Sequence, residues 1–164
     1  MKDLFYTVHS GSWKERRHAI EEIDELIDER ALTRDDTRYF LKLLESPDSS
    51  VRDFAWRWIL SLIDMGLITR EDSGFFLGLL ESDDPLTRLY AWENIGYLVS
   101  KGVVTPEEVK ERKRFFLELL ESSHVRVRRK AWEIAGALIG KGIIGREILC
   151  GDPTDWGAKG RIRR

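Results

Sequence analysis

The chain of 164 residues contains no glutamine, a single asparagine and a single cysteine, Cys150, and it has no long apolar run. One cysteine excludes an intramolecular disulfide and makes a reducing, cytoplasmic location the expectation. No segment approaches the roughly 18 apolar residues that a membrane helix needs, so we expect no membrane contact. Scarce amides together with 34% charged residues are the bias reported for hyperthermophile proteins, which predicts a thermophilic source.

The net charge is only −2, so the chain has no overall positive electrostatic potential that would attract nucleic acid. The charge is nevertheless uneven, because residues 1–82 carry 11 basic and 17 acidic side chains and residues 83–164 carry 16 and 12. Phosphate-binding glycine loops and nucleophile–histidine sets are missing. His18 and Glu22 share a helix face, but two ligands do not make a metal site. We therefore expect no catalytic residues, no metal and no cofactor.

An internal repeat organises the sequence. The string LLES occurs at 43–46, 79–82 and 119–122. An alanine recurs in register at spacings of 36, 36 and 40 residues, as Ala19, Ala55, Ala91 and Ala131. The third period is longer because segment 109–122 holds four additional residues, about one helical turn, which predicts a longer helix there.

Each repeat unit is predicted to contain two helices. The longer helix has apolar residues at helical spacing, as at Val51, Ala55 and Ile59. At the start of each longer helix the sequence has a residue type that favours the N-cap position. After the end of the helix it has a glycine, which can adopt the left-handed backbone conformation of a C-terminal cap. The N-caps are Ser12, Asp48, Asp84 and Ser123, and the glycines are Gly66, Gly102 and Gly142. The shorter helix is expected to begin at a threonine with an acid three residues later, a capping-box pattern, at Thr33, Thr69 and Thr105.

These signals predict an all-α fold of stacked helix pairs. The expected units cover about 4–30, 33–66, 69–102 and 105–142 within one domain, 1–145. An irregular basic tail, 146–164, is expected to follow, because this segment has no periodicity. Atypical end units are normal in such arrays, since an end has no neighbour to cover it.

The spacing Asp-x-x-Val-Arg-x-x-Ala, complete at Asp48, Val51, Arg52 and Ala55, resembles the HEAT-repeat family. Partial copies occur in register in the other three units. The resemblance implies a right-handed α-α superhelix, a HEAT-like solenoid of about three and a half helix pairs. It also implies that the motif helices line a concave face. Because most HEAT-like proteins bind other proteins, the resemblance further implies a protein-binding role. The motif arginines would then tie neighbouring units to turn aspartates as a ladder of Arg16, Arg52, Arg88 and Arg128.

An arginine precedes a tryptophan by four residues in three units, as Arg52/Trp56, Arg88/Trp92 and Arg128/Trp132. Residues at this spacing share a helix face and can form cation–π pairs. A repeated stripe of such pairs would suit a binding groove, since Trp and Arg dominate interface hot spots. The favoured alternative is that each tryptophan fills the seam between neighbouring helix pairs. Trp58, Tyr90 and Tyr97 are further candidates for exposed aromatic side chains.

The expected function is therefore that of a non-catalytic scaffold that binds a protein partner of unknown identity. One alternative is nucleic-acid binding, including activity of the HEAT-like DNA glycosylase type, through the basic clusters 124–130 and 159–164. Another is a structural subunit of a larger assembly, with Trp156 of the tail as an anchor. The uneven charge also suggests weak head-to-tail self-association.

Overall fold

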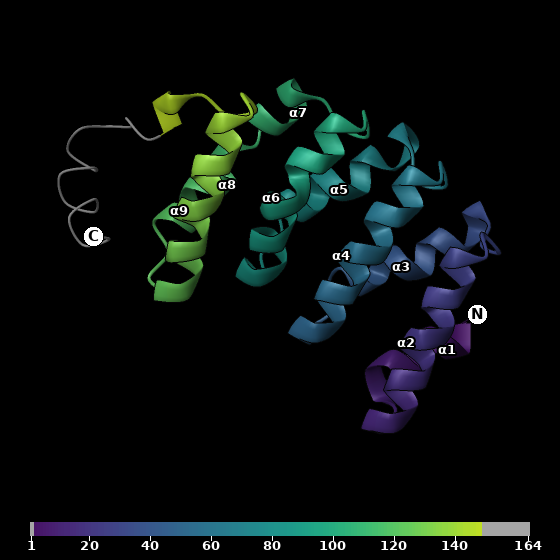
Figure 1. The fold of residues 1–164 in the computed structure, drawn as a ribbon. Coiled ribbons are helices and arrows are strands. Elements are labelled where there is room, and N and C mark those ends of the chain that lie inside the picture. Colours follow the sequence, from purple (N-terminus) through teal and green to yellow (C-terminus); the bar gives the residue numbers. More distant parts are fainter. Residues whose placement is uncertain (1, 149–164) are drawn as a thin grey trace. The chain divides into compact units, whose positions relative to one another are not determined.

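The computed structural model describes residues 2–148, and within them the chain forms nine α-helices, three short 3-10 helices and no strand (Figure 1). This confirms the all-α prediction for the described part. The contacts divide the chain into two compact units, with unit 1 ending at Glu71 and unit 2 beginning at Asp72. Among the described helices, none has the length and apolar character needed to cross a membrane.

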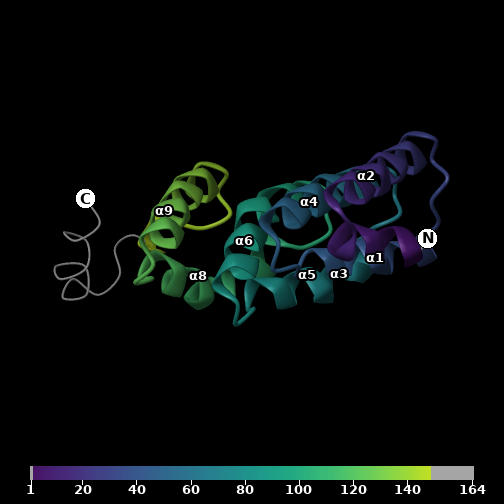
Figure 2. The ribbon, with the colours of Figure 1, turned by 90° about the horizontal axis from the view of Figure 1, so that it is seen from below.

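Unit 1 contains two helix pairs. Its helices are α1 (Lys2–Ser10), α2 (Trp13–Asp28), α3 (Thr37–Leu43) and α4 (Ser49–Asp64), with the 3-10 helix η1 (Arg34–Asp36) before α3. Consecutive helices pack as α1 with α2 and α3 with α4, and α2 also contacts α4. The longer helices α2 and α4 thus form one layer, and α1 and α3 form the other (Figure 2). Phe5, Ile23, Phe40 and Ile59 are buried between them.

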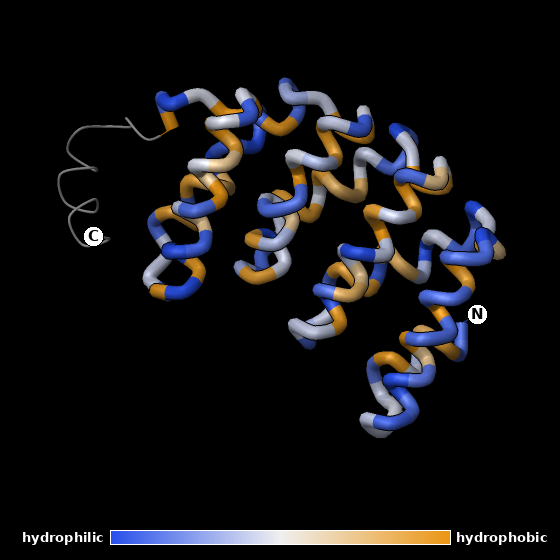
Figure 3. Tube along the Cα trace, viewed as in Figure 1, coloured by the Kyte–Doolittle hydropathy of each residue, from blue (hydrophilic) through white to orange (hydrophobic). Residues whose placement is uncertain are grey.

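Unit 2 repeats this arrangement. Its helices are α5 (Ser73–Leu80), α6 (Pro85–Ser100), α7 (Pro106–Lys110), α8 (Lys113–Leu120) and α9 (Val125–Gly140), followed by the 3-10 helix η3 (Arg146–Ile148). The 3-10 helix η2 (Arg70–Asp72) spans the point where the chain passes from unit 1 to unit 2. The pairs are α5 with α6 and α8 with α9, and the long helices α6 and α9 lie side by side. Apolar and polar segments alternate along each helix, as expected when one side of a helix is buried (Figure 3).

The long helices begin where capping chemistry allows. The carboxylate of Asp48 accepts hydrogen bonds from the N–H groups of Ser50 and Val51, and that of Asp84 accepts from Thr87. These bonds satisfy backbone donors that the first turn leaves free. The fourth N-cap is His124 and not the predicted Ser123, because the turn places Ser122 and His124 where Ser46 and Asp48 lie in unit 1.

The predicted left-handed glycines are confirmed. Gly66, Gly102 and Gly142 have φ angles of +77°, +74° and +71°. In the first pair the equivalent position is occupied by Arg30, which has a φ of +55°. A side chain in this region is strained, so the first pair makes the same turn at a higher conformational cost.

The prediction of one longer helix in the fourth unit is wrong. The segment divides instead into α7 and α8, and Arg112 between them leaves helical geometry at φ −106° and ψ 12°. Four added residues would turn a continuous helix by about 40° beyond a full turn. The break restores the register, so that Val109 of α7 and Phe116 of α8 are both fully buried.

The first three residues of the predicted tail form η3, and Ile148 is buried. Helical structure therefore continues three residues past the expected end of the array. Cys150, Trp156 and the basic cluster 159–164 lie outside the described residues.

Candidate binding surface

The arginines of the Arg–Trp pairs close the turns before their own helices. In each case the guanidinium donates a hydrogen bond to the carbonyl oxygen of the serine six residues earlier. These bonds join Arg52 to Ser46 at 2.7 Å, Arg88 to Ser82 at 2.8 Å and Arg128 to Ser122 at 2.8 Å. The serine of each LLES string thus belongs to a repeated turn, and the three arginines have a structural role within their units.

The tryptophans do not form an exposed stripe. Trp56 and Trp92 are 4% and 0% exposed, and Trp132 is partly buried. The indole N–H of Trp92 donates to the carbonyl oxygen of Leu80 at 3.1 Å, and its ring centroid lies 4.9 Å from that of Phe116. The predicted binding role is therefore wrong for Trp56 and Trp92, because these large apolar side chains lie in the core. For Trp92 the structure agrees with the alternative interpretation, in which the ring fills the seam with the next helix pair.

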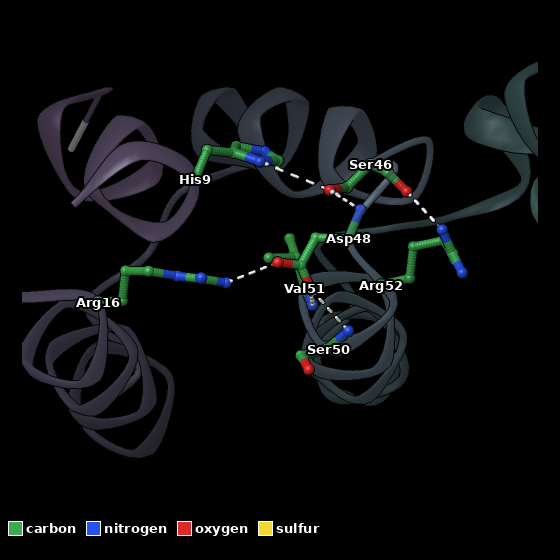
Figure 4. A network of polar contacts seen from close by, with 7 residues as sticks. All are labelled: His9, Arg16, Ser46, Asp48, Ser50, Val51 and Arg52. Carbon is green, nitrogen blue, oxygen red and sulfur yellow. Dashed lines mark hydrogen bonds and ion pairs between the residues drawn. The ribbon is translucent and has the colours of Figure 1, made fainter. Parts of the chain in front are cut away.

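The motif arginines reach neighbouring pairs in different ways. Arg16 makes the bond that the resemblance implies, with its Nη2 atom 2.9 Å from Oδ2 of Asp48 in the next pair (Figure 4). Arg88 instead binds Glu118 of α8, at 2.6 Å, and the carbonyl oxygen of Phe115. The reason lies in the turn before α9, where His124 replaces the aspartate. The Arg–Asp link that the resemblance implies is therefore present at Arg16 and is replaced at Arg88 by the bond to Glu118.

Asp48 is the centre of the polar network in unit 1. Its backbone N–H donates to the hydroxyl of Ser46, which also lies 3.5 Å from Nδ1 of His9 (Figure 4). Burial alone would raise the pKa of Asp48. Hydrogen bonds from Arg16 and from the Val51 and Ser50 N–H groups outweigh burial and lower this pKa below its usual value. The network thus stabilises the ionised carboxylate of Asp48 at the start of α4.

The exposed aromatic side chains are not those that the repeat suggested. Trp58 is 3% exposed and donates to Oδ1 of Asp24 at 2.6 Å, which corrects its assignment to the surface. Tyr6 and Trp13 of the first pair are 73% and 74% exposed instead. The guanidinium carbon of Arg17 lies 5.6 Å from the Trp13 ring centroid. These two aromatics have no counterpart in the inner repeats, so the repeat pattern gave no signal for them.

A pocket of about 170 Å³ lies between the long helices α6 and α9 of unit 2. Its lining is Glu93, Gly96, Lys130, Glu133, Ile134, Ala137, Leu138 and Lys141. The lining combines three aliphatic side chains of α9 with four charged side chains. A Cβ atom at Gly96 would lie 3.0 Å from the amine of Lys141, so a larger residue here would require the flexible Lys141 side chain to shift. The mid-helix glycine was visible in the sequence, but the pocket was not predicted.

The two lysines that line the pocket differ in their partners. Nζ of Lys130 lies 3.0 Å from a carboxylate oxygen of Glu93 and 3.9 Å from one of Glu133. The hydrogen bond to Glu93 raises the pKa of Lys130. Lys141 has no acidic partner among residues 2–148. The charge of Lys130 is therefore neutralised, and that of Lys141 is available to an anionic group.

Residues 2–148 contain no cluster of three or more metal-ligating side chains. His18 lies beside Glu21, with 3.8 Å between Nδ1 and the carboxylate, and both side chains are largely exposed. Within these residues, the candidate binding surfaces are therefore the pocket and the exposed helix faces.

Compared with family models, curated proteins and solved structures, the chain gives no match.

Proposed function

We propose that this chain is a non-catalytic, HEAT-like scaffold, a right-handed α-α superhelix of about three and a half helix pairs that acts in the cytoplasm. Its task is to bind a protein partner through the layer of long helices. The pocket between α6 and α9 is the observation that carries this proposal, because its lining combines aliphatic and charged side chains. Such a combination is typical of sites where apolar contacts supply affinity and polar groups supply selectivity.

The chemistry of the pocket defines its ligand. Ile134, Ala137 and Leu138 offer a small aliphatic surface, which fits one branched aliphatic side chain. Lys141 at the end of this surface favours a carboxylate, while the Lys130–Glu93 pair closes the other end with balanced charge. A peptide or helix with an acidic residue near an aliphatic residue matches this order of groups.

Nucleic-acid binding is the second candidate from the sequence. Arg126 and Arg129 of α9 are exposed and compatible with phosphate contacts. Residues 72–148, however, carry 12 basic and 12 acidic side chains, so unit 2 presents no net positive field. Binding that falls steeply with added salt would favour this candidate.

Selection of a displayed peptide library on the purified chain, followed by measurement of the selected peptides by fluorescence anisotropy, tests the proposal. We expect the selected peptides to share an acidic and an aliphatic residue. Ala137→Arg fills the pocket and Lys141→Glu reverses its free charge, so each should weaken binding at least tenfold.

Lys101→Glu is the matched control, because Lys101 holds the equivalent position after α6 and does not line the pocket. Its peptide affinity should stay within twofold of the unmodified chain. Equal losses in Lys101→Glu and Lys141→Glu would contradict the assignment of the pocket. A structural subunit role would give no selected peptide at all.

A further inference from the structure

The contact of α2 with α4 in unit 1 shows what the equivalent space in unit 2 can hold. The recurring alanines align α2 with α6 by a shift of 72 residues and α4 with α9 by a shift of 76. Gly96 then corresponds to Asp24, and Ile134 corresponds to Trp58. In unit 1 the indole N–H of Trp58 on α4 donates to Asp24 on α2 at 2.6 Å, and Trp58 is only 3% exposed. One large side chain with a polar group therefore occupies this space between the long helices.

In unit 2 smaller side chains stand at both positions. Glycine and isoleucine replace the aspartate and the tryptophan, and Lys130 replaces Phe54, whose ring stacks on that of Trp58 with 5.8 Å between centroids. Gly96, Lys130 and Ile134 all line the pocket of about 170 Å³. The pocket thus lies where unit 1 has a large side chain of its own. It belongs to an inner contact between two helix pairs, so an outside group can complete the packing that the chain itself completes in unit 1.

The polar group at this place has the opposite character in the two units. In unit 1 the Asp24 carboxylate accepts a hydrogen bond from the indole. In unit 2 the side chain of Lys141 extends back along α6, and its amine lies 3.0 Å from the position that a Cβ atom of Gly96 would take. Lys141 has no acidic partner among residues 2–148. Unit 2 therefore offers a cation to an acceptor, and a carboxylate is the group that complements it.

The size of the pocket limits how a ligand can bring its two groups. The cation and the aliphatic side chains line the same small space, so the carboxylate and the aliphatic group must lie close together. Within a peptide these groups belong to two side chains, and each side chain that is immobilised costs free energy. In the last residue of a chain, the terminal carboxylate and the side chain are bonded to the same Cα atom. One residue then supplies both groups, as Trp58 alone supplies an apolar ring and a polar N–H in unit 1.

We propose that the pocket of unit 2 binds the C-terminal residue of a partner protein, with a branched aliphatic side chain between α6 and α9 and the terminal carboxylate on the amine of Lys141. This inference rests on the proposed function and names the source of the carboxylate. Lys130 stays paired with Glu93, so Lys141 is the group that recognises the chain end. A peptide with a blocked or fused C-terminus supplies only a side-chain carboxylate and should bind more weakly.

Fluorescence anisotropy of the full chain with three labelled peptides tests the inference. The peptides share one uncharged sequence with a blocked N-terminus. The first ends in leucine with a free carboxylate, and the second ends in the same leucine as an amide. The third is also an amide and has an aspartate before the leucine. We expect the free peptide to bind about tenfold more tightly than either amide, because only its carboxylate and side chain reach their partners together.

Lys141→Met separates the carboxylate from the rest of the pocket, since methionine is uncharged and is the residue of unit 1 at this position, Met65. This variant should bind the free peptide about tenfold more weakly and the simple amide as before. Lys113→Met is the matched control, because Lys113 of α8 is exposed and does not line the pocket. It should keep the preference for the free end. Ile134→Trp puts the large side chain of unit 1 into the pocket, so it should weaken the binding of all three peptides.

Equal affinities of the free peptide and the aspartate-containing amide would overturn the inference and leave the proposed function standing. A preference for the free end that survives Lys141→Met would also overturn it, because the chain end would then be recognised elsewhere. Failure of all three peptides to bind would remove the inference together with the proposed function. If far-UV circular dichroism shows that Ile134→Trp does not fold, the comparison of Lys141→Met with Lys113→Met decides alone.

Discussion

Arg16 of α2 binds Asp48 at the start of α4, with 2.9 Å between Nη2 and Oδ2. The other carboxylate oxygen of Asp48 accepts the N–H groups of Ser50 and Val51. One side chain therefore starts a helix and ties it to the preceding pair. Asp48→Asn keeps an N-cap but loses the ion pair, so it should lower the free energy of unfolding by about 0.2–1 kcal/mol.

Asp48→Ala removes the cap as well, and the loss should increase to about 1–2 kcal/mol. Urea denaturation measures both differences. Asp84→Asn and Asp84→Ala are the matched pair in unit 2, where the hydrogen bonds of the carboxylate go to Thr87. Equal effects of the Asn and Ala variants at Asp48 would show that the helix cap contributes nothing beyond the ion pair.

The same carboxylate predicts a pH dependence. The folded state lowers the pKa of Asp48 below its usual 3.8, so the folded chain binds fewer protons at this site than the unfolded chain. Its contribution is complete above the unfolded pKa and is lost as the pH falls through the folded pKa. Between pH 5 and pH 2, Asp48→Asn should therefore lose less stability than the unmodified chain. A constant difference between the two chains across this range would contradict the assignment.

Arg30→Gly should stabilise the chain. Arg30 has a φ of +55° at the position where the other three pairs have glycine. Its side chain is exposed and takes part in no described ion pair, so only the strained backbone changes. We expect a gain of about 1 kcal/mol in the free energy of unfolding. Gly66→Arg is the reverse control and should cost a similar amount, and a loss of stability in Arg30→Gly would refute the strain argument.

The thermophilic bias of the composition predicts a high melting temperature. Single domains from mesophiles unfold at about 45–65 °C, so thermal circular dichroism should give a midpoint above that range. A midpoint near 50 °C would show that the scarcity of amides has another origin.

The helices were predictable because their signals are local and repeated. Periodic apolar residues, N-cap aspartates and terminal glycines depend on neighbours within one or two turns, and the structure agrees at Asp48, Asp84 and Gly66. The division into α7 and α8 was not predictable from the added four residues. It follows from the register between Val109 and Phe116, which packing sets and spacing alone does not show.

The surface was harder to predict because burial depends on what a neighbouring pair supplies. The sequence marks Trp92 and Trp132 as equivalent, but Trp92 is fully buried against Phe116 and Trp132 is only partly buried. The pocket likewise needs Gly96 of α6 to lie beside Lys141, which follows α9 and lies 45 residues later in the chain. Side chains that meet across two helix pairs leave no short-range pattern from which such a site can be recognised.

The burial of the tryptophans gives the last prediction. Trp92 is fully buried against Phe116 and bonded to Leu80, so Trp92→Ala should cost about 3–5 kcal/mol in the free energy of unfolding. Trp13 is 74% exposed, and Trp13→Ala should change stability by no more than about 0.5 kcal/mol. Urea denaturation followed by circular dichroism compares the same substitution in both settings. Similar losses in the two variants would contradict the exposure of Trp13. An unchanged unfolding midpoint in Trp92→Ala would contradict the packing of the Trp92 ring on Phe116.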